Sequence, residues 1–126
     1  MNGDHPKVLV VDDEKDVRDL AEYFLSNAGY KMILAEDGQQ AFKLYSENKD
    51  TIDVIVSDVQ MPLMNGMELY KKVREIDHVP FVFITGSGEV DLLTKDYLVL
   101  CKPLNFDKLP EILNSVIVNH DVNLYK

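Results

Sequence analysis

The fold of this chain is decided near its start, by the stretch Val8-Leu9-Val10-Val11-Asp12-Asp13-Glu14. Four apolar residues in a row, most of them β-branched, predict a strand buried on both faces, as in a parallel sheet covered by helices. The run then stops at three acidic residues. A strand formed here therefore presents carboxylates at its carboxyl end.

Four similar apolar runs follow, and amphipathic segments separate them. The segment from about residue 14 to 27 repeats its apolar side chains with the 3.6-residue period of a helix and is stopped by Gly29. Two later helices are expected after the Asp37-Gly38 turn and from near Asn65-Gly66. The five expected strands cover residues 8–11, 32–34, 54–56, 81–84 and 98–101.

The last expected helix carries apolar residues from Leu109 to Ile117. Pro110 fits only in its first turn, and Asp107 is the candidate cap. The stretch between Gly88 and Leu98 has room for barely two helical turns, so the fourth helix must be short or irregular. The whole alternation predicts an α/β fold, a doubly wound five-stranded parallel sheet with right-handed crossovers.

Length and composition indicate one soluble globular domain of 126 residues, with a core at about 7–118 and a polar tail at 120–126. The single cysteine, Cys101, excludes an internal disulfide and is expected in the core. The chain lacks a signal-peptide pattern and a membrane-spanning run, so we expect a cytoplasmic protein. Its net charge of −9 disfavours direct binding to nucleic acid.

Acidic, hydroxyl and amino side chains leave the expected strands at their carboxyl ends. In an open α/β sheet, ligands bind at this edge. Two carboxylates about 4 Å apart repel by roughly 4 kcal/mol at an effective dielectric near 20, so several together recruit a cation or a proton. Magnesium prefers such oxygen ligands. The residues concerned are Asp12-Asp13-Glu14, Ser57-Asp58, Thr85-Gly86 and Lys102-Pro103.

Taken in order, these motifs resemble the receiver domains of two-component response regulators. The resemblance covers about residues 7–118 and rests on Asp12-Asp13, Asp58, Gln60-Met61-Pro62 with Gly66, Thr85 and Lys102-Pro103. It implies the flavodoxin-like strand order 2-1-3-4-5. It also implies that Asp58 accepts a phosphoryl group from a phosphohistidine, and that the protein is a signalling phosphoacceptor that assists its own phosphorylation and dephosphorylation. The implied partners are a histidine kinase or phosphotransfer protein and an unknown downstream protein, with the chain a monomer or weak dimer.

The resemblance assigns a role to each motif. Asp58 and Asp13 ligate Mg²⁺ (or Mn²⁺) directly, Asp12 assists, and the backbone carbonyl of Gln60 completes the protein ligands. Lys102 pairs with Asp58 at rest and with the phosphoryl group afterwards, aimed by a cis peptide at Pro103. Thr85 donates its hydroxyl to the phosphoryl group. Gln60 and Ser87 flank the site and tune hydrolysis.

Simpler roles remain open for several of these residues. Asp58 could cap the following turn, Asp12 or Asp13 the first helix, and Thr85 or Ser87 a later one. The chain also departs from the family, because Thr85 and Lys102 are only 17 positions apart. Val99 stands where many family members carry the switch aromatic, and Tyr97 is the candidate to take the place of that aromatic residue. We therefore expect phosphorylation to be read by another surface, with the first helix as the candidate.

Three other functions compete. A phosphatase of the haloacid-dehalogenase kind needs an aspartate two residues after its nucleophile, which neither Asp12 nor Asp58 has. A flavin carrier needs a phosphate loop where this chain has Asp12-Asp13-Glu14. The third alternative, a receiver-like interaction module that works without phosphorylation, stays open.

Overall fold

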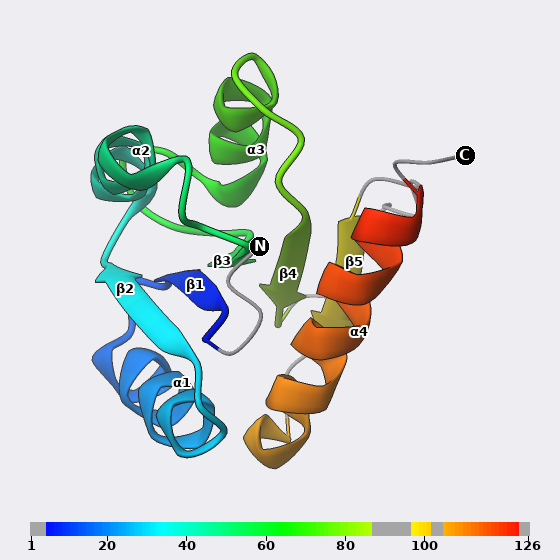
Figure 1. Cartoon of the computed structure of the whole chain (residues 1–126). Helices are drawn as coiled ribbons and strands as arrows, with labels where there is room; N and C mark the ends of the chain where they lie inside the picture. The colour runs from blue at the N-terminus through cyan, green and yellow to red at the C-terminus, as the bar shows by residue number, and fades with distance from the viewer. Residues whose placement is uncertain (1–4, 87–96, 102–104, 124–126) are drawn as a thin grey trace.

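A computed structural model describes residues 5–86, 97–101 and 105–123 of the chain. Strands and helices alternate along it, as the sequence predicts (Figure 1). The elements are β1 (Lys7–Val11), α1 (Lys15–Asn27), β2 (Lys31–Ala35), α2 (Gly38–Asn48), β3 (Val54–Asp58), α3 (Gly66–Arg74), β4 (Phe81–Thr85), β5 (Tyr97–Cys101), the 3₁₀ turn η1 (Phe106–Lys108) and α4 (Leu109–Asn123). The predicted short fourth helix falls at 89–95, outside the described residues.

All five strands form one parallel sheet in the order β2-β1-β3-β4-β5, so the expected order is confirmed. The three inner strands are buried almost along their whole length, whereas the edge strands β2 and β5 are only partly covered. This matches the continuous apolar runs from which the inner strands were predicted. At the carboxyl ends of the inner strands, Val11 of β1 lies opposite Ser57 of β3, and Asp58 of β3 lies opposite Ile84 of β4.

Helices cover both faces of the sheet, with α2 and α3 on one side and α1 and α4 on the other (Figure 1). Alternate residues of each inner strand face the two layers. Leu9 and Val11 pack with Tyr45 of α2, while Val8 and Val10 pack toward α1 and α4. The strand ends between the two helix layers are thereby fixed from both sides.

Local sequence signals set the helix boundaries. Gly29 has a φ of +91°, and the N–H groups of Gly29 and Tyr30 donate to the carbonyls of Ser26 and Leu25, which closes α1 as a Schellman motif. Asp37 caps α2 by accepting from the Gln40 N–H. Asn65 and Glu68 form a capping box at the start of α3.

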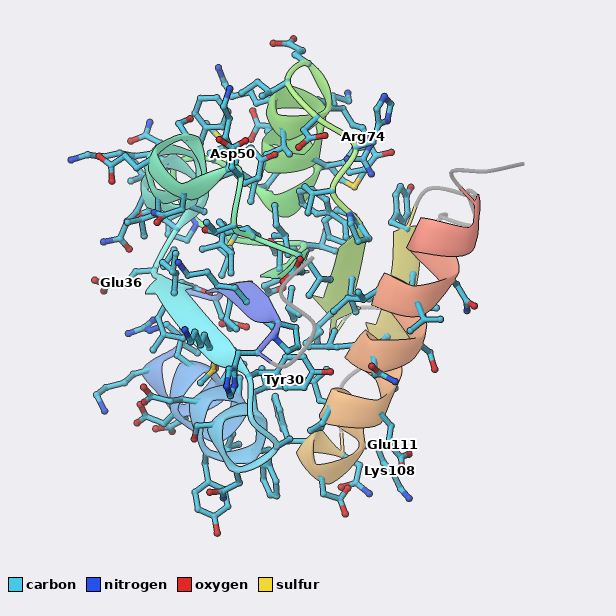
Figure 2. The ribbon with its side chains drawn as sticks, viewed as in Figure 1. Tyr30, Glu36, Asp50, Arg74, Lys108 and Glu111 are labelled. Atoms are coloured by element: carbon cyan, nitrogen blue, oxygen red, sulfur yellow. The ribbon has the colours of Figure 1, made fainter. Side chains whose placement is uncertain are left out.

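The C-terminal region differs from expectation in two ways. Asp107 lies inside η1, because helical backbone already begins at Phe106, so its assignment as the cap of the last helix is wrong. The helix continues through Asn123 into the segment expected to be a tail, since neither glycine nor proline interrupts it. Pro110 does lie in the first turn, where its carbonyl accepts from the Tyr30 hydroxyl at 2.9 Å (Figure 2).

A third difference concerns the edge of the sheet. Cys101, the last residue of β5, is exposed, so the expectation that it is a core residue is wrong. Its place in an edge strand explains this, because β5 pairs through only one side with β4 among the described strands.

Candidate functional site

Three polar side chains lie buried at the carboxyl edge of the sheet. Asp12 directly follows β1, Asp58 is the last residue of β3, and Thr85 is the last residue of β4. Their exposed fractions are 2%, 7% and 2%. Because β1, β3 and β4 are parallel neighbours, their ends bring these residues to one place. Buried polar groups need compensation, which makes this edge the candidate site.

The carboxylates at this edge form a compact group. One oxygen each from Asp12, Glu14 and Asp58 lies within 4.8 Å of the other two. Three carboxylates at this spacing repel one another and are stabilised by a cation. The oxygen donors and their spacing fit Mg²⁺, which also keeps several of its own waters. Glu14 is exposed, so the group is open to solvent on its side.

Backbone N–H groups orient two of these carboxylates. The Glu14 N–H donates to Asp12 Oδ1 at 2.9 Å, and the Gln60 N–H donates to Asp58 Oδ1 at 3.2 Å. Each bond joins an aspartate to the residue two positions later, the pattern of an Asx turn. The first of these turns folds the chain back after β1, which brings Glu14 beside Asp12.

The loop after Asp58 is held close to the strand that it leaves. The Gly66 N–H donates to the Val59 carbonyl at 2.8 Å. A Cβ atom on Gly66 would lie 2.4 Å from the Asp58 carbonyl oxygen, so only glycine fits this approach. Within the loop, Leu63 has a φ of 71°, and the Met64 N–H donates to the Pro62 carbonyl at 2.8 Å. This tight three-residue turn leaves the Leu63 side chain exposed.

The other predicted site residues are placed as follows. Asp13 and Gln60 are exposed beside the group, and the roles assigned to them stay predictions. Lys102, Pro103 and Ser87 lie outside the described residues.

Tyr97 and Val99, the candidate switch positions, lie on β5 next to the strand that ends in Thr85. Val99 is opposite Phe83 in the register of β4 and β5. The Tyr97 ring packs edge-on against Phe83 and Tyr70, with ring centroids 5.0 and 5.1 Å apart. Tyr97 therefore contacts a residue two positions before Thr85 on the same face of β4.

Sequence reasoning did not single out Glu14, whose carboxylate the structure places with those of Asp12 and Asp58. It placed Glu14 in the acidic run and chose Asp13 as the direct ligand. The available signal was the length of the glutamate side chain at the third residue of an Asx turn, since the bond that closes the turn brings that residue back to Asp12.

Comparison with known proteins agrees with this architecture. A family model described as the response regulator receiver domain matches residues 8–114. The chain is 31% identical over 118 residues to the transcriptional regulatory protein CpxR of Escherichia coli (strain K12). The matched region covers 88% of this chain and 49% of CpxR. The chain thus spans about half the length of that curated relative.

Solved structures give the same picture. The receiver domain of the hybrid histidine kinase CckA is 34% identical, with a TM-score of 0.78 over 88% of this chain and 98% of that one. A response regulator receiver domain protein from Clostridium thermocellum is 25% identical, with a TM-score of 0.85 over 93% and 98% of the two chains. Among the described residues, none of the helices has the length and apolar character needed to cross a bilayer.

Proposed function

The chain belongs to the response regulator receiver family, and from that premise we propose that Asp58 accepts a phosphoryl group from a phosphohistidine of a histidine kinase or phosphotransfer protein. Receiver domains are signalling phosphoacceptors of two-component systems rather than classical enzymes. The observation that carries the proposal is the position of Asp58. It is the buried last residue of an inner strand, and one of its carboxylate oxygens lies within 4.8 Å of oxygens from Asp12 and Glu14.

The proposed transfer is a simple exchange of bonds. A carboxylate oxygen of Asp58 attacks the phosphorus, an O–P bond forms, the N–P bond of the phosphohistidine breaks, and the released imidazole takes up a proton. Hydrolysis of the acyl phosphate later returns Asp58 and inorganic phosphate. Such transfers need positioning and charge neutralisation more than covalent assistance. The strand end and the Gln60 N–H supply the positioning of Asp58.

Mg²⁺ or Mn²⁺ would supply positive charge for the phosphoryl oxygens. Asp12, Asp58, Asp13 and the backbone carbonyl of Gln60 are the proposed protein ligands, by resemblance to the family. Glu14 joins this set on the spacing of its carboxylate. With several acidic side chains at one edge, this chain can hold a divalent cation and keep waters on the solvent side.

The remaining roles follow the family pattern. Thr85 is proposed to donate its hydroxyl to the transferred group, since it is buried at the end of the strand next to Asp58. Lys102, aimed by Pro103, is proposed to neutralise a phosphoryl oxygen, and Gln60 and Ser87 to set the rate of hydrolysis. Tyr97 is proposed to couple Thr85 to the rest of the domain through Phe83.

We propose that α1 forms the surface that reads the phosphorylated state. Two of its large apolar side chains are exposed, Leu20 at 44% and Tyr23 at 61%, and acidic residues surround them on the helix. A partner with an apolar patch and basic neighbours would fit this surface. NMR chemical-shift changes caused by an acyl-phosphate mimic should map to α1. Changes confined to another face would remove α1 from this role.

The proposed unit is a single receiver domain over residues 1–126, with its core at about 7–118. It is proposed to work in the cytoplasm as a monomer or weak dimer and not to bind nucleic acid directly. Its central step is tested by incubation of the chain with acetyl phosphate and Mg²⁺, followed by intact-mass measurement. The wild type should gain the mass of one phosphoryl group, while Asp58→Asn and a sample with chelator should not. No gain in the wild type would favour the phosphorylation-independent interaction module.

A further inference from the structure

Arg18 of α1 reaches back to the acidic edge of the sheet. Its Nη1 donates to the backbone carbonyl of Asp12 at 2.8 Å, six residues earlier in the chain. The Arg18 side chain is only 14% exposed, so this bond is protected from water. A hydrogen bond from a charged donor is stronger than a neutral one, and burial strengthens it further.

This bond is one of several that hold Asp12. The Asp12 N–H donates to the Ala35 carbonyl at 3.1 Å, which ties it to the end of β2. Its carboxylate accepts from the Glu14 N–H, and its carbonyl accepts from Arg18. Asp12 is therefore fixed through its amide, its carbonyl and its side chain. Any looseness at the carbonyl would turn the following peptide and with it the Asx turn that carries Glu14.

The outer side of the Arg18 guanidinium faces Glu36, which lies at the surface near the end of β2 (Figure 2). The Nη2–Oε1 distance is 3.9 Å, and the Glu36 side chain is 67% exposed. An exposed ion pair of this length contributes little. The bond to Asp12, rather than the contact with Glu36, is the one that can position the site.

We propose that Arg18 is a positioning residue for the cation site, acting through the backbone of Asp12. The inference rests on the proposed function, since it concerns how the acidic loop is held for the cation. Arg18 has two opposing effects. Its bond holds Asp12 and Glu14 in place, which favours the cation, and its charge repels the cation. The proposal is that the positioning effect is the larger of the two, so that loss of Arg18 weakens cation binding.

Four variants separate these effects. Arg18→Gln removes the charge and the long donor, and Arg18→Lys keeps the charge and one donor. Glu36→Gln removes only the outer pair. Arg74→Gln is the matched control, because Arg74 also donates to a backbone carbonyl at 2.8 Å, that of Val79 before β4. Arg74 is the last residue of α3, and Figure 2 shows it well separated from Glu36.

Two measurements are made on each full chain without a phosphoryl donor. One is the Mg²⁺ affinity by titration calorimetry, and the other is hydrogen exchange of the Glu14 amide, which reports the bond to Asp12. Arg18→Gln should weaken Mg²⁺ binding about tenfold, as removal of an outer-shell partner commonly does, and should speed Glu14 exchange. Arg18→Lys should recover part of both. Glu36→Gln and Arg74→Gln should leave both unchanged, although Arg74→Gln lowers the unfolding temperature.

The inference is overturned if Arg18→Gln binds Mg²⁺ as tightly as the wild type or more tightly, or if Arg74→Gln weakens binding equally. Failure of the proposed function has a different signature, the absence of Mg²⁺ binding in the wild type. In that case the Glu14 amide still decides the role of Arg18. Exchange unchanged in Arg18→Gln refutes it, and faster exchange supports it.

Discussion

Replacement of Gly66 by alanine tests how closely the loop after Asp58 must approach β3. The added Cβ would lie 2.4 Å from the Asp58 carbonyl oxygen, 3.1 Å from Val59 Cα and 3.2 Å from a Phe83 ring carbon. Two of these three neighbours belong to the backbone and cannot rotate away. An ordinary contact therefore requires the loop and the strand end to separate by roughly 1 Å, a displacement that can slow a positioned reaction about a hundredfold.

The effect on stability has two parts. Overpacking costs about 1–3 kcal/mol, while exchanging glycine for alanine in a helix gains up to about 1 kcal/mol. The clash outweighs the gain, so Gly66→Ala should lower the free energy of unfolding by about 1–2 kcal/mol, or the melting temperature by roughly 4–8 °C. Phosphorylation by acetyl phosphate should slow by about one to two orders of magnitude at a temperature where the variant is folded.

Gly29→Ala is the matched control. Gly29 has a φ of +91° with nothing near its Cβ position, so alanine there should cost about 1 kcal/mol through backbone strain alone. Gly29 closes the end of α1, and no role in phosphoryl transfer is proposed for it. This variant should therefore lose stability and keep the wild-type phosphorylation rate. Phosphorylation of Gly66→Ala at the wild-type rate, or equal slowing in Gly29→Ala, would show that the close approach of Gly66 does not position Asp58.

Three smaller predictions concern stability, measured by urea unfolding. Asn65→Ala removes the side-chain half of the capping box at α3, the bond that the Asn65 side chain accepts from the Glu68 N–H, and should cost about 1 kcal/mol, whereas an unchanged midpoint would mean that the cap is replaced. Lys15→Ala breaks the exposed pair with Asp19 and should leave the urea midpoint essentially unchanged, because solvent screens such a pair, and a clear fall in the midpoint would contradict this. Burial, and then the Asp77 carboxylate, raises the pKa of Tyr45 to about 12. Since this pKa lies above the ordinary value of about 10, the contribution of the protonated Tyr45 hydroxyl to the free energy of unfolding is complete below pH 10 and is lost as pH rises toward 12. Between pH 10 and 12 the free energy of unfolding should therefore fall less in Tyr45→Phe than in the wild type. Parallel pH profiles of the two proteins would contradict this prediction.

Most of the fold could be predicted from the sequence because its signals are local. The inner strands are buried on both faces and so appear as uninterrupted apolar runs, as in Val54-Ile55-Val56. Asp37, Asn65 and Gly29 mark helix ends through hydrogen bonds and backbone angles that depend on a few neighbouring residues. Parallel strands then force Asp12, Asp58 and Thr85 to one edge.

The remainder depends on contacts that a linear pattern does not carry. The place of the Glu14 carboxylate beside that of Asp12 depends on one bond, from the Glu14 N–H to the Asp12 side chain. The exposure of Cys101 depends on what covers an edge strand. The positive φ of Leu63 is unusual for a residue with a bulky side chain and follows from the tight loop after Asp58, not from leucine itself.

The central claim is that the acidic edge of the sheet makes Asp58 the phosphoryl acceptor. The most direct measurement treats the phosphorylated chain with borohydride, which reduces an aspartyl phosphate to homoserine, and then locates the changed residue by peptide mass spectrometry. Homoserine is expected at position 58 only after phosphorylation in the presence of Mg²⁺. Modification at another residue, or none at position 58 in a chain that has gained a phosphoryl group, would contradict it.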